Sequence, residues 1–322
     1  MKAAVVTGSG LVVQDAPEPK PKPNEILVRV KAASLNRADL AVASGHAHGA
    51  IGGPGTIPGL EWAGEIVEAG AEVRGFKVGD RVMCSGSGGY AEYAATDFGR
   101  CSPVPAGMSF ETATTLPMAL QTMHDAVVTN GRLQPGETIM VQGASSGVGL
   151  MALQIARRRG ASIVIGTSTN ADRRARLAEF GATHTLDTSD PAWPDRVLEI
   201  TGGKGVNVII DQVSASVANG NMRAAAVLGR VVNVGRLGGA TGEFDYDLHA
   251  LKRISYIGVT FRTRSVEEVR EINRKMREDL WDAVGKGELR LPVDRSFRLD
   301  DVKDALAHMK SNGHFGKVLL VP

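Results

Sequence analysis

A turn of small residues between an apolar stretch and a helical pattern is the part of the chain best suited to bind a ligand. The segment Val141–Gly160 reads VQGASSGVGLMALQIARRRG. Small side chains let the backbone approach a pyrophosphate, and the free N–H groups at the start of a helix stabilise its charge. Ala144, Ser146 and Gly149 stand where the pattern G-x-G-x-x-G has its glycines. The surrounding alternation of strand and helix predicts a dinucleotide site, although such turns also serve plain close packing.

The end of the next apolar strand distinguishes the two nicotinamide dinucleotides. Sites for NAD usually place an acid there, which accepts hydrogen bonds from the ribose 2′-hydroxyl. Here the chain reads GTSTN over 166–170 and continues to Arg173 and Arg174. Hydroxyl groups and guanidinium groups bind a 2′-phosphate well, so this segment predicts NADPH. The alternative is that both arginines only face solvent on a helix.

Composition and charge exclude several other classes of protein. The 322 residues carry a net charge of +2, from 37 basic and 35 acidic residues, which argues against a nucleic-acid or membrane partner. Cys84 and Cys101 are too few for a disulfide framework or a four-cysteine metal site. The chain shows neither a signal peptide nor an apolar stretch near the ~20 residues that cross a bilayer. We therefore expect a cytoplasmic protein.

The pattern of apolar residues predicts an α/β protein with two domains. The first hundred residues read as β-strands, with Glu25–Ala33 alternating and with a loop rich in Gly and Pro over His46–Pro58. From about Ala113, strands alternate with helices, which predicts a doubly wound parallel sheet. The final strand, Gly316–Val321, has no sheet of its own, so we expect it to return to the N-terminal β domain. The later strands are predicted at Ser162–Thr167, Val206–Val213, Arg230–Gly235 and Ile254–Phe261.

Five motifs, in one order along essentially the whole chain, resemble the medium-chain dehydrogenase/reductase superfamily. They are SLNRAD (34–39), PGLEWAGEIVEAGAEVRGFKVGDRV (58–82), GGYAEY (88–93), the GASSGVG turn (143–149) and HFGKVLL (314–320). The segment GVTFRTRSVEE (258–268) is similar to the branch that contains bacterial NADPH:quinone reductases. The resemblance implies a discontinuous GroES-like catalytic domain, 1–116 with 262–322, and a Rossmann NADPH-binding domain, 117–261.

The zinc branch of this superfamily is not the one that the chain resembles. That branch has a Cys at the position of Asn36 and a His at the position of Leu60, and neither residue here is a good zinc ligand. Its four-cysteine lobe is also missing, and His46, His48 and Glu61 have no spacing that suggests a metal site. The resemblance therefore implies a zinc-independent enzyme without a metal, similar to the quinone oxidoreductases, including ζ-crystallin-like members.

The resemblance also implies the site residues. In the family the nicotinamide lies between the domains, near the positions of Asn36 and Thr122, and the adenosine phosphate lies near Arg173. Asn36 could instead satisfy a turn, and Thr122 could pack inside a helix. The predicted cofactor-binding residues are Ser145, Ser146, Gly147, Val148, Gly149, Thr167, Ser168, Arg173, Gly235, Arg236, Phe261, Phe315, Gly316 and Lys317.

Three positions depart from the family. Many relatives have a Tyr near the substrate where Ala41 stands, which leaves the substrate open. Thr188 stands where relatives have a Tyr near the adenine, and Ser146 replaces the middle glycine of the turn, with a hydroxyl that could contact a phosphate. These two changes bear on cofactor affinity.

The expected activity is hydride transfer to a small electrophilic acceptor. A quinone, or an activated alkene as the alternative, accepts hydride without the Lewis acid that an ordinary carbonyl needs. From another class, the chain could be an NADPH-binding structural or sensor protein with little turnover. Arg37, Asp39 and Tyr90 are possible proton donors or merely structural residues. We also expect a homodimer, because the apolar strand Ile254–Phe261 would otherwise leave an uncovered sheet edge.

Overall fold

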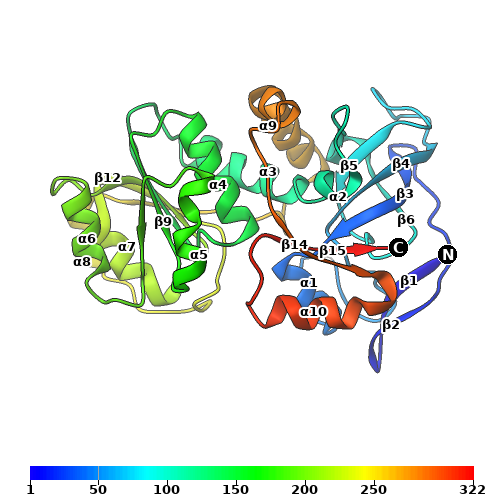
Figure 1. The fold of residues 1–322 in the computed structure, drawn as a ribbon, viewed down its shortest axis with the longest axis horizontal. Coiled ribbons are helices and arrows are strands. Elements are labelled where there is room, and N and C mark those ends of the chain that lie inside the picture. Colours follow the sequence, from blue (N-terminus) through cyan, green and yellow to red (C-terminus); the bar gives the residue numbers. More distant parts are fainter. Residues whose placement is uncertain (50) are drawn as a thin grey trace. The chain divides into compact units, whose positions relative to one another are not determined.

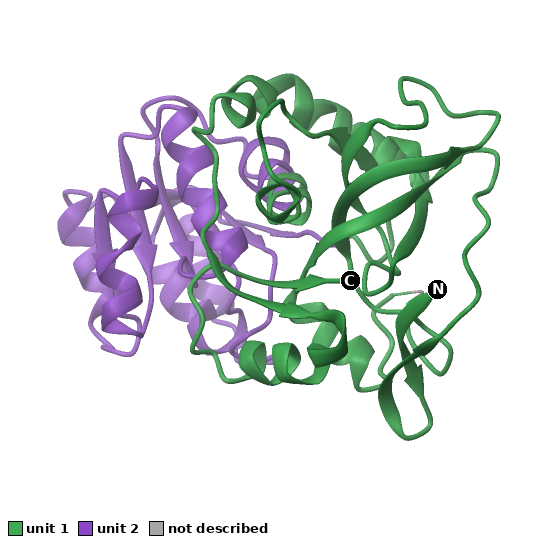
Figure 2. Cartoon of the chain, turned by 45° about the vertical axis from the view of Figure 1, so that its right-hand side comes forward, with its two compact units in different colours: residues 1–121, 261–322 green, residues 122–260 purple. Residues whose placement is uncertain are grey.

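The computed structural model describes residues 1–49 and 51–322. They divide into two compact units: unit 1 comprises Met1–Gln121 and Phe261–Pro322, and unit 2 comprises Thr122–Thr260 (Figure 2). The sequence places the boundaries at 116/117 and 261/262, whereas the first division of the structure falls inside helix α3 (Pro117–His124). No helix of the described residues is long and apolar enough to cross a membrane.

Unit 1 is built on a seven-stranded sheet with the order β14-β15-β3-β4-β5-β7, in which β6 also pairs with β3. Apolar residues of β3 and β4, such as Val28 and Trp62, lie in one buried core. The described part of His46–Pro58, which leaves out Ala50, has no regular element beyond a bridge between His48 and Ile51. The elements of this unit are β1 (Lys2–Thr7), β2 (Gly10–Asp15), β3 (Glu25–Ser34), α1 (Arg37–Ala43), β4 (Glu61–Ala69), β5 (Arg81–Ser85), β6 (Tyr93–Asp97), β7 (Cys101–Pro103), α2 (Phe110–Ala113), α9 (Val266–Gly285), β14 (Val293–Arg298), α10 (Val302–Lys310) and β15 (Lys317–Val321), with 3-10 turns at Phe98–Arg100 and Leu299–Asp301.

The last strand of the chain completes this sheet. β15 pairs antiparallel with β3, with Leu320 opposite Ala33, and parallel with β14. The prediction that the final strand returns to the N-terminal β domain is confirmed. Strand β14 was not predicted, because its sequence VDRSFR is mostly polar and its side chains are largely exposed.

Unit 2 contains a six-stranded sheet in which every pair of strands is parallel, with the order β10-β9-β8-β11-β12-β13. This confirms the predicted doubly wound sheet. Helices α6, α7 and α8 pack on one face, around Met140, Ile209 and Val231 (Figure 1). Alternate residues of the same strands point to the other face, where α4 contacts β8 and β9. The elements are β8 (Thr138–Gln142), α4 (Gly147–Arg158), β9 (Ile163–Thr167), α5 (Ala171–Ala175), β10 (His184–Leu186), α6 (Trp193–Ile200), β11 (Val206–Asp211), α7 (Ala218–Ala224), β12 (Ala225–Asn233), α8 (Tyr246–Lys252) and β13 (Ser255–Gly258), with a π-helix at Asp125–Asn130 and 3-10 turns at Leu177–Phe180 and Ala215–Val217.

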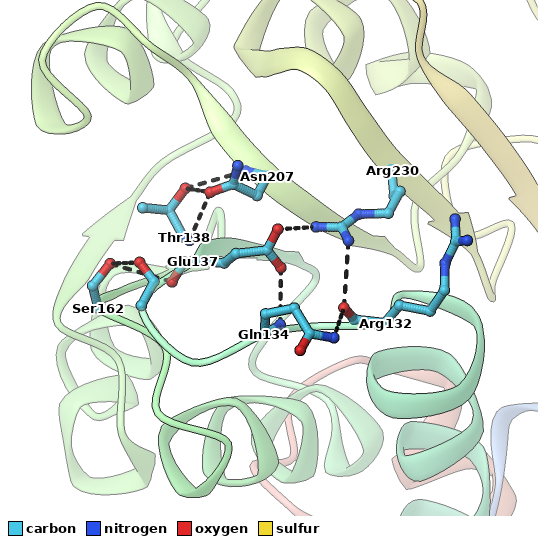
Figure 3. Close-up of polar contacts among 8 residues, drawn as sticks. Arg132, Gln134, Glu137, Thr138, Ser162, Asn207 and Arg230 are labelled. Atoms are coloured by element: carbon cyan, nitrogen blue, oxygen red, sulfur yellow. Dashed lines mark hydrogen bonds and ion pairs between the residues drawn. The ribbon is translucent and has the colours of Figure 1, made fainter.

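Polar side chains near the amino ends of strands in unit 2 form hydrogen bonds with one another and with the backbone (Figure 3). Glu137 accepts hydrogen bonds from the Arg230 guanidinium at 2.5 Å and from the backbone N–H of Gln134 at 2.9 Å. The side-chain oxygen of Asn207 accepts both the backbone N–H and the hydroxyl of Thr138, each at 3.0 Å. These contacts join the strands at their amino ends. In such folds a ligand binds at the opposite, carboxyl ends of the strands.

Candidate active site

The turn between β8 and α4 has the geometry that a dinucleotide pyrophosphate needs. Ser146 is the N-cap of α4, and its hydroxyl oxygen accepts the N–H of Gly149 at 3.1 Å. A Cβ on Gly149 would lie 2.7 Å from the carbonyl oxygen of Gly143, so only glycine fits there. Gly143 has φ +69°, the left-handed region that favours glycine. The predicted residues Gly147, Val148 and Gly149 form the first turn of α4.

The hydroxyl of Ser146 is already used inside the protein. It donates to Gln212 Oε1 at 2.8 Å and accepts from the N–H of Gly149. The Ser146 hydroxyl mainly caps the helix. The predicted contact between this hydroxyl and a phosphate oxygen would therefore require one of these hydrogen bonds to break.

The end of β9 brings the next group of predicted residues beside this turn. The Thr167 hydroxyl accepts the N–H of Gly143 at 3.1 Å, and the hydroxyls of Ser145 and Ser168 lie 3.1 Å apart. Thr167 and Ser168 are buried. Ser145, Ser146, Thr167 and Ser168 therefore gather at the carboxyl ends of two neighbouring strands.

Both arginines of the predicted phosphate site lie on α5, which follows this strand. The backbone N–H of Arg173 donates to the Asn170 side chain at 2.9 Å. Arg174 donates from Nη1 to the carbonyl oxygen of Ser168 at 2.7 Å and to Asp187 at 3.0 Å. The guanidinium of Arg174 is therefore fixed next to Ser168.

A buried polar network supports the turn from below. Gln142 Oε1 accepts the Thr167 hydroxyl at 2.8 Å, and Gln142 Nε2 donates to Asn221 Oδ1 at 2.8 Å. Asn221 in turn donates to Asp211 at 3.0 Å. Burial raises the pKa of the Asp211 carboxyl despite these hydrogen bonds, and burial together with Asp211 raises the pKa of Tyr256 to about 12. The network links β8, β9 and β11, so it fixes the relative positions of the loops at their ends.

Gly235 and Arg236, predicted to bind the cofactor, follow the carboxyl end of β12, which lies on the other side of β8 from β9 in the strand order. The carbonyl oxygen of Gly235 accepts the Ser214 hydroxyl at 2.5 Å, and a Cβ on Gly235 would lie 2.7 Å from the carbonyl oxygen of Gln212. Arg236 lines a pocket of about 330 Å³ together with Asn233 and Tyr256. Gly235 is thus required by packing, while Arg236 faces open space.

The second cluster lies in unit 1 and centres on the buried carboxylate of Glu61. Its Oε1 accepts hydrogen bonds from the Ser34 hydroxyl at 2.6 Å, Asn36 Nδ2 at 2.9 Å and Lys317 Nζ at 2.5 Å. Its Oε2 accepts the backbone N–H of Met118 at 2.9 Å. Lys317 Nζ also donates to Asn36 Oδ1 at 3.0 Å. The amide of Asn36 is therefore oriented by one cation and one anion.

Asp39 and Tyr90 extend this cluster. Asp39 caps α1 by accepting the backbone N–H of Asn36 at 2.7 Å, and it accepts the Tyr90 hydroxyl at 2.8 Å. Both side chains are fully buried. Burial raises the pKa of the Asp39 carboxyl to about 6, against the lowering effect of its hydrogen bonds and of Lys317. These contacts give Asp39 and Tyr90 a structural role, and the Arg37 guanidinium donates to the side-chain oxygen of Asn312. Proton donation by any of the three stays a prediction.

The remaining predicted residues are divided between the two units. Phe315 is buried, and its N–H donates to Asp294 at 3.0 Å. Gly316 has φ +94° and precedes β15. Phe261 begins the second segment of unit 1, and Thr122 lies on α3 at the start of unit 2.

The residues around Glu61 do not fit a zinc ion. Zinc sites combine thiolates, imidazoles and carboxylates, whereas the groups here are an amide, an ammonium and a carboxylate whose Oε1 already accepts three hydrogen bonds. Leu60, which precedes Glu61, offers no ligand atom. Over residues 1–49 and 51–322, no group of three or more His, Cys, Asp or Glu side chains could hold a metal ion.

The turn in unit 2 does fit a dinucleotide. Gly149 lets the start of α4 pack closely on the backbone of Gly143 and Ala144, and the N-terminus of this twelve-residue helix lies at the turn. Gln142, Asn221 and Asp211 were not predicted, because buried polar side chains have no periodic signal. Glu61 was named only as a possible metal ligand, although it lies within the PGLEW motif.

Comparisons with known proteins agree with this description. Residues 22–106 match the family model for the alcohol dehydrogenase GroES-like domain, and residues 147–278 match that for zinc-binding dehydrogenases. The rat quinone oxidoreductase-like protein 2 is 32% identical over 324 residues, covering 99% of this chain and 91% of the relative.

Two solved structures extend the likeness to the fold. A mycobacterial protein complexed with NADPH has 26% identity and a TM-score of 0.89, with 100% of both chains covered. The CurK enoyl reductase has 25% identity and a TM-score of 0.87, with 99% of both chains covered. The chain belongs to the medium-chain dehydrogenase/reductase superfamily of oxidoreductases, among its quinone oxidoreductase-like members. The fold and these relatives indicate a nicotinamide cofactor.

Proposed function

We propose that this protein is a zinc-independent, NADPH-dependent oxidoreductase that transfers hydride to a quinone. The observation that carries the proposal is the Glu61 carboxylate, which is bound by Asn36, Lys317 and the backbone of Met118. The groups gathered here, an amide, an ammonium and a carboxylate, are not the set that binds zinc in proteins. An acceptor at this site must therefore accept hydride without a Lewis acid, which quinones do readily.

The cofactor preference rests on the end of β9. Thr167 and Ser168 stand where an NAD site usually has an acid, and the arginines of α5 follow. The relative solved with NADPH supports the same choice. NADPH supplies the hydride when it is bound, with the α4 turn holding the pyrophosphate.

The residues of the chain would act by positioning. Lys317 and Glu61 fix the rotation of the Asn36 amide, so that its remaining N–H and its carbonyl oxygen have a defined direction. Asn36 and Thr122 are proposed as nicotinamide contacts on the family resemblance. The assignments of Ser145, Arg173, Gly235, Arg236, Phe261, Phe315 and Gly316 to the cofactor are proposals of the same kind, as is the cytoplasmic location.

An activated alkene is the second candidate for the acceptor. It also takes hydride without a metal, and the CurK enoyl reductase is structurally similar over almost the whole chain. A structural or sensor protein would bind NADPH without turnover.

We also propose a homodimer formed through β13. This strand is at the edge of the six-stranded sheet. Two apolar side chains, Leu228 on its partner strand β12 and Leu251 on α8, are 61% and 73% exposed. An open edge strand beside apolar surface favours pairing with a second chain.

The experiment that tests the function compares NADPH and NADH oxidation with quinones and with enones, with and without a chelator. The proposal expects turnover of quinones that prefers NADPH and is unaffected by the chelator. Turnover of enones alone would select the alkene reductase, and NADPH binding without turnover would select the sensor. Loss of activity with the chelator would overturn the argument from Glu61.

A further inference from the structure

One nitrogen of the Arg174 guanidinium, Nη1, is held by two hydrogen bonds. It donates to the carbonyl oxygen of Ser168 at 2.7 Å and to Asp187 Oδ2 at 3.0 Å. Asp187 is itself fixed, because its Oδ1 accepts the backbone N–H and the hydroxyl of Ser189 at 2.9 and 2.6 Å. The side chains of Arg174 and Asp187 are 24% and 31% exposed, so the pair is ordered but reachable from solvent.

The other edge of the same guanidinium carries N–H groups that are available for a further hydrogen-bond acceptor. Among the residues that the structure describes, Nε and Nη2 of Arg174 have no hydrogen-bond partner. An arginine binds an oxyanion best with two parallel N–H groups, one donor on each of two nitrogens. Anchoring through Nη1 leaves such an edge available and reduces the entropy that Arg174 would lose on binding an anion.

The position of this edge indicates which anion it would take. Arg174 bonds the backbone of Ser168, the residue that follows the strand end where dinucleotide folds place the adenosine ribose. The Ser168 and Ser145 hydroxyls, 3.1 Å apart, are neutral donors at the same place. Ribose with a 2′-phosphate would meet both hydroxyls and a guanidinium, whereas the carboxylate that adjoins this guanidinium, Asp187, is already paired with it.

We propose that Arg174, held in place by Asp187 and the Ser168 carbonyl, binds the 2′-phosphate and determines the preference for NADPH over NADH. Asp187 is then a positioning residue. The inference rests on the proposed use of NADPH and deepens it, because the family resemblance points to Arg173 alone for this role.

The test measures binding of adenosine 2′,5′-bisphosphate and of 5′-AMP by calorimetry, since the two probes differ only in the 2′-phosphate. Arg174→Met should weaken the bisphosphate about tenfold and leave 5′-AMP within about twofold, as expected for lost hydrogen bonds to a charged group. Arg174→Lys keeps the charge and loses the two-nitrogen edge, so its affinity for the bisphosphate should lie between those of the wild type and Arg174→Met. Asp187→Asn should weaken the bisphosphate about threefold, because the guanidinium is then less well fixed.

Two matched variants control for charge. Arg176→Met removes a cation two residues away that pairs with Glu179, and Asp190→Asn removes an acid from the same loop as Asp187. Both should leave the bisphosphate affinity unchanged. An Arg176→Met loss equal to that of Arg174→Met would show only general electrostatics and overturn the assignment.

The remaining outcomes are also decisive. Tighter bisphosphate binding by Asp187→Asn would make Asp187 a competitor and overturn its positioning role. If the wild-type chain binds 5′-AMP as tightly as the bisphosphate, the proposed NADPH preference itself fails. If it discriminates and Arg174→Met still does, the NADPH preference stands and only the role of Arg174 is lost.

Discussion

The ammonium of Lys317 lies 2.5 Å from Glu61 Oε1, and the exposed fractions of the two side chains are 6% and 0%. The two residues come from strands β15 and β4, which are far apart in the chain. Such a pair is maintained by complete hydrogen bonding, and Ser34, Asn36 and Met118 supply it on the side of Glu61.

Removing one charge of this pair should destabilise unit 1. Lys317→Met or Glu61→Gln leaves the other group buried and uncompensated, which costs about 3–5 kcal/mol. Urea unfolding should show the loss, and the double variant should recover part of it. Lys286→Met is the control, since its pair with Asp282 is solvent-exposed and contributes about 0.5 kcal/mol or less. Equal effects at both positions would contradict the argument.

Stability should depend on the protonation of Asp39. Its pKa in the folded protein is raised to about 6 from 3.8, so the protonated form is the one that folding favours. The contribution is fully present below pH 3.8 and is lost as the pH rises through about 6. A shift of this size corresponds to about 3 kcal/mol. The difference in unfolding free energy between the wild type and Asp39→Asn, measured between pH 4 and 7, should change in this direction; a constant difference would refute it.

Adding a side-chain carbon at Gly149 should weaken cofactor binding by distorting the turn before α4. Gly149→Ala places a Cβ 2.7 Å from the backbone of Gly143 and Ala144, which forces the α4 turn apart. We expect NADPH affinity to fall at least about tenfold, measured by fluorescence titration. Gly258→Ala, at a glycine of the same unit where a Cβ meets no atom within 4 Å, is the matched control. Unchanged affinity in Gly149→Ala would argue against this turn as the pyrophosphate site.

A charge on the edge strand should prevent dimer formation. Ile257 lies on β13 and is half-buried, so Ile257→Lys places an ammonium where a second strand would pair. Light scattering should show a dimer for the wild type and a monomer for the variant. A monomeric wild type would rule out the proposed homodimer.

Strands could be predicted from the sequence where alternating or continuous apolar residues indicate which side chains are buried. The alternation of Glu25–Ala33 and the apolar run Ser162–Thr167 identified β3 and β9 within one residue, and the apolar stretch before the GASSGVG turn is β8. Strand β10 was missed, because its three residues are exposed or half-buried and too short for any period. Strand β14 exists because β15 pairs with it.

The site was predicted only in part, for a physical reason. The turn at Ser146 and Gly149 is local, so neighbouring residues specify it. The bonds of Glu61 to Asn36 and Lys317 join residues 25 and 256 positions away, and no local pattern encodes them. The anchoring of Arg174 by Asp187 likewise depends on where β10 lies.

The return of β15 to the sheet of unit 1 sets an order on folding during synthesis. Unit 2 is one continuous segment, so it can fold as soon as residues 122–260 leave the ribosome. Strands β3 to β7 of the unit 1 sheet pair with one another before residue 104, but β14 and β15 come only with residues 293–321. Until then β3 lacks its pairing with β15, and Glu61 lacks its cation. Unit 2 can therefore be complete while the buried carboxylate of Glu61 still waits for the last strand of the chain.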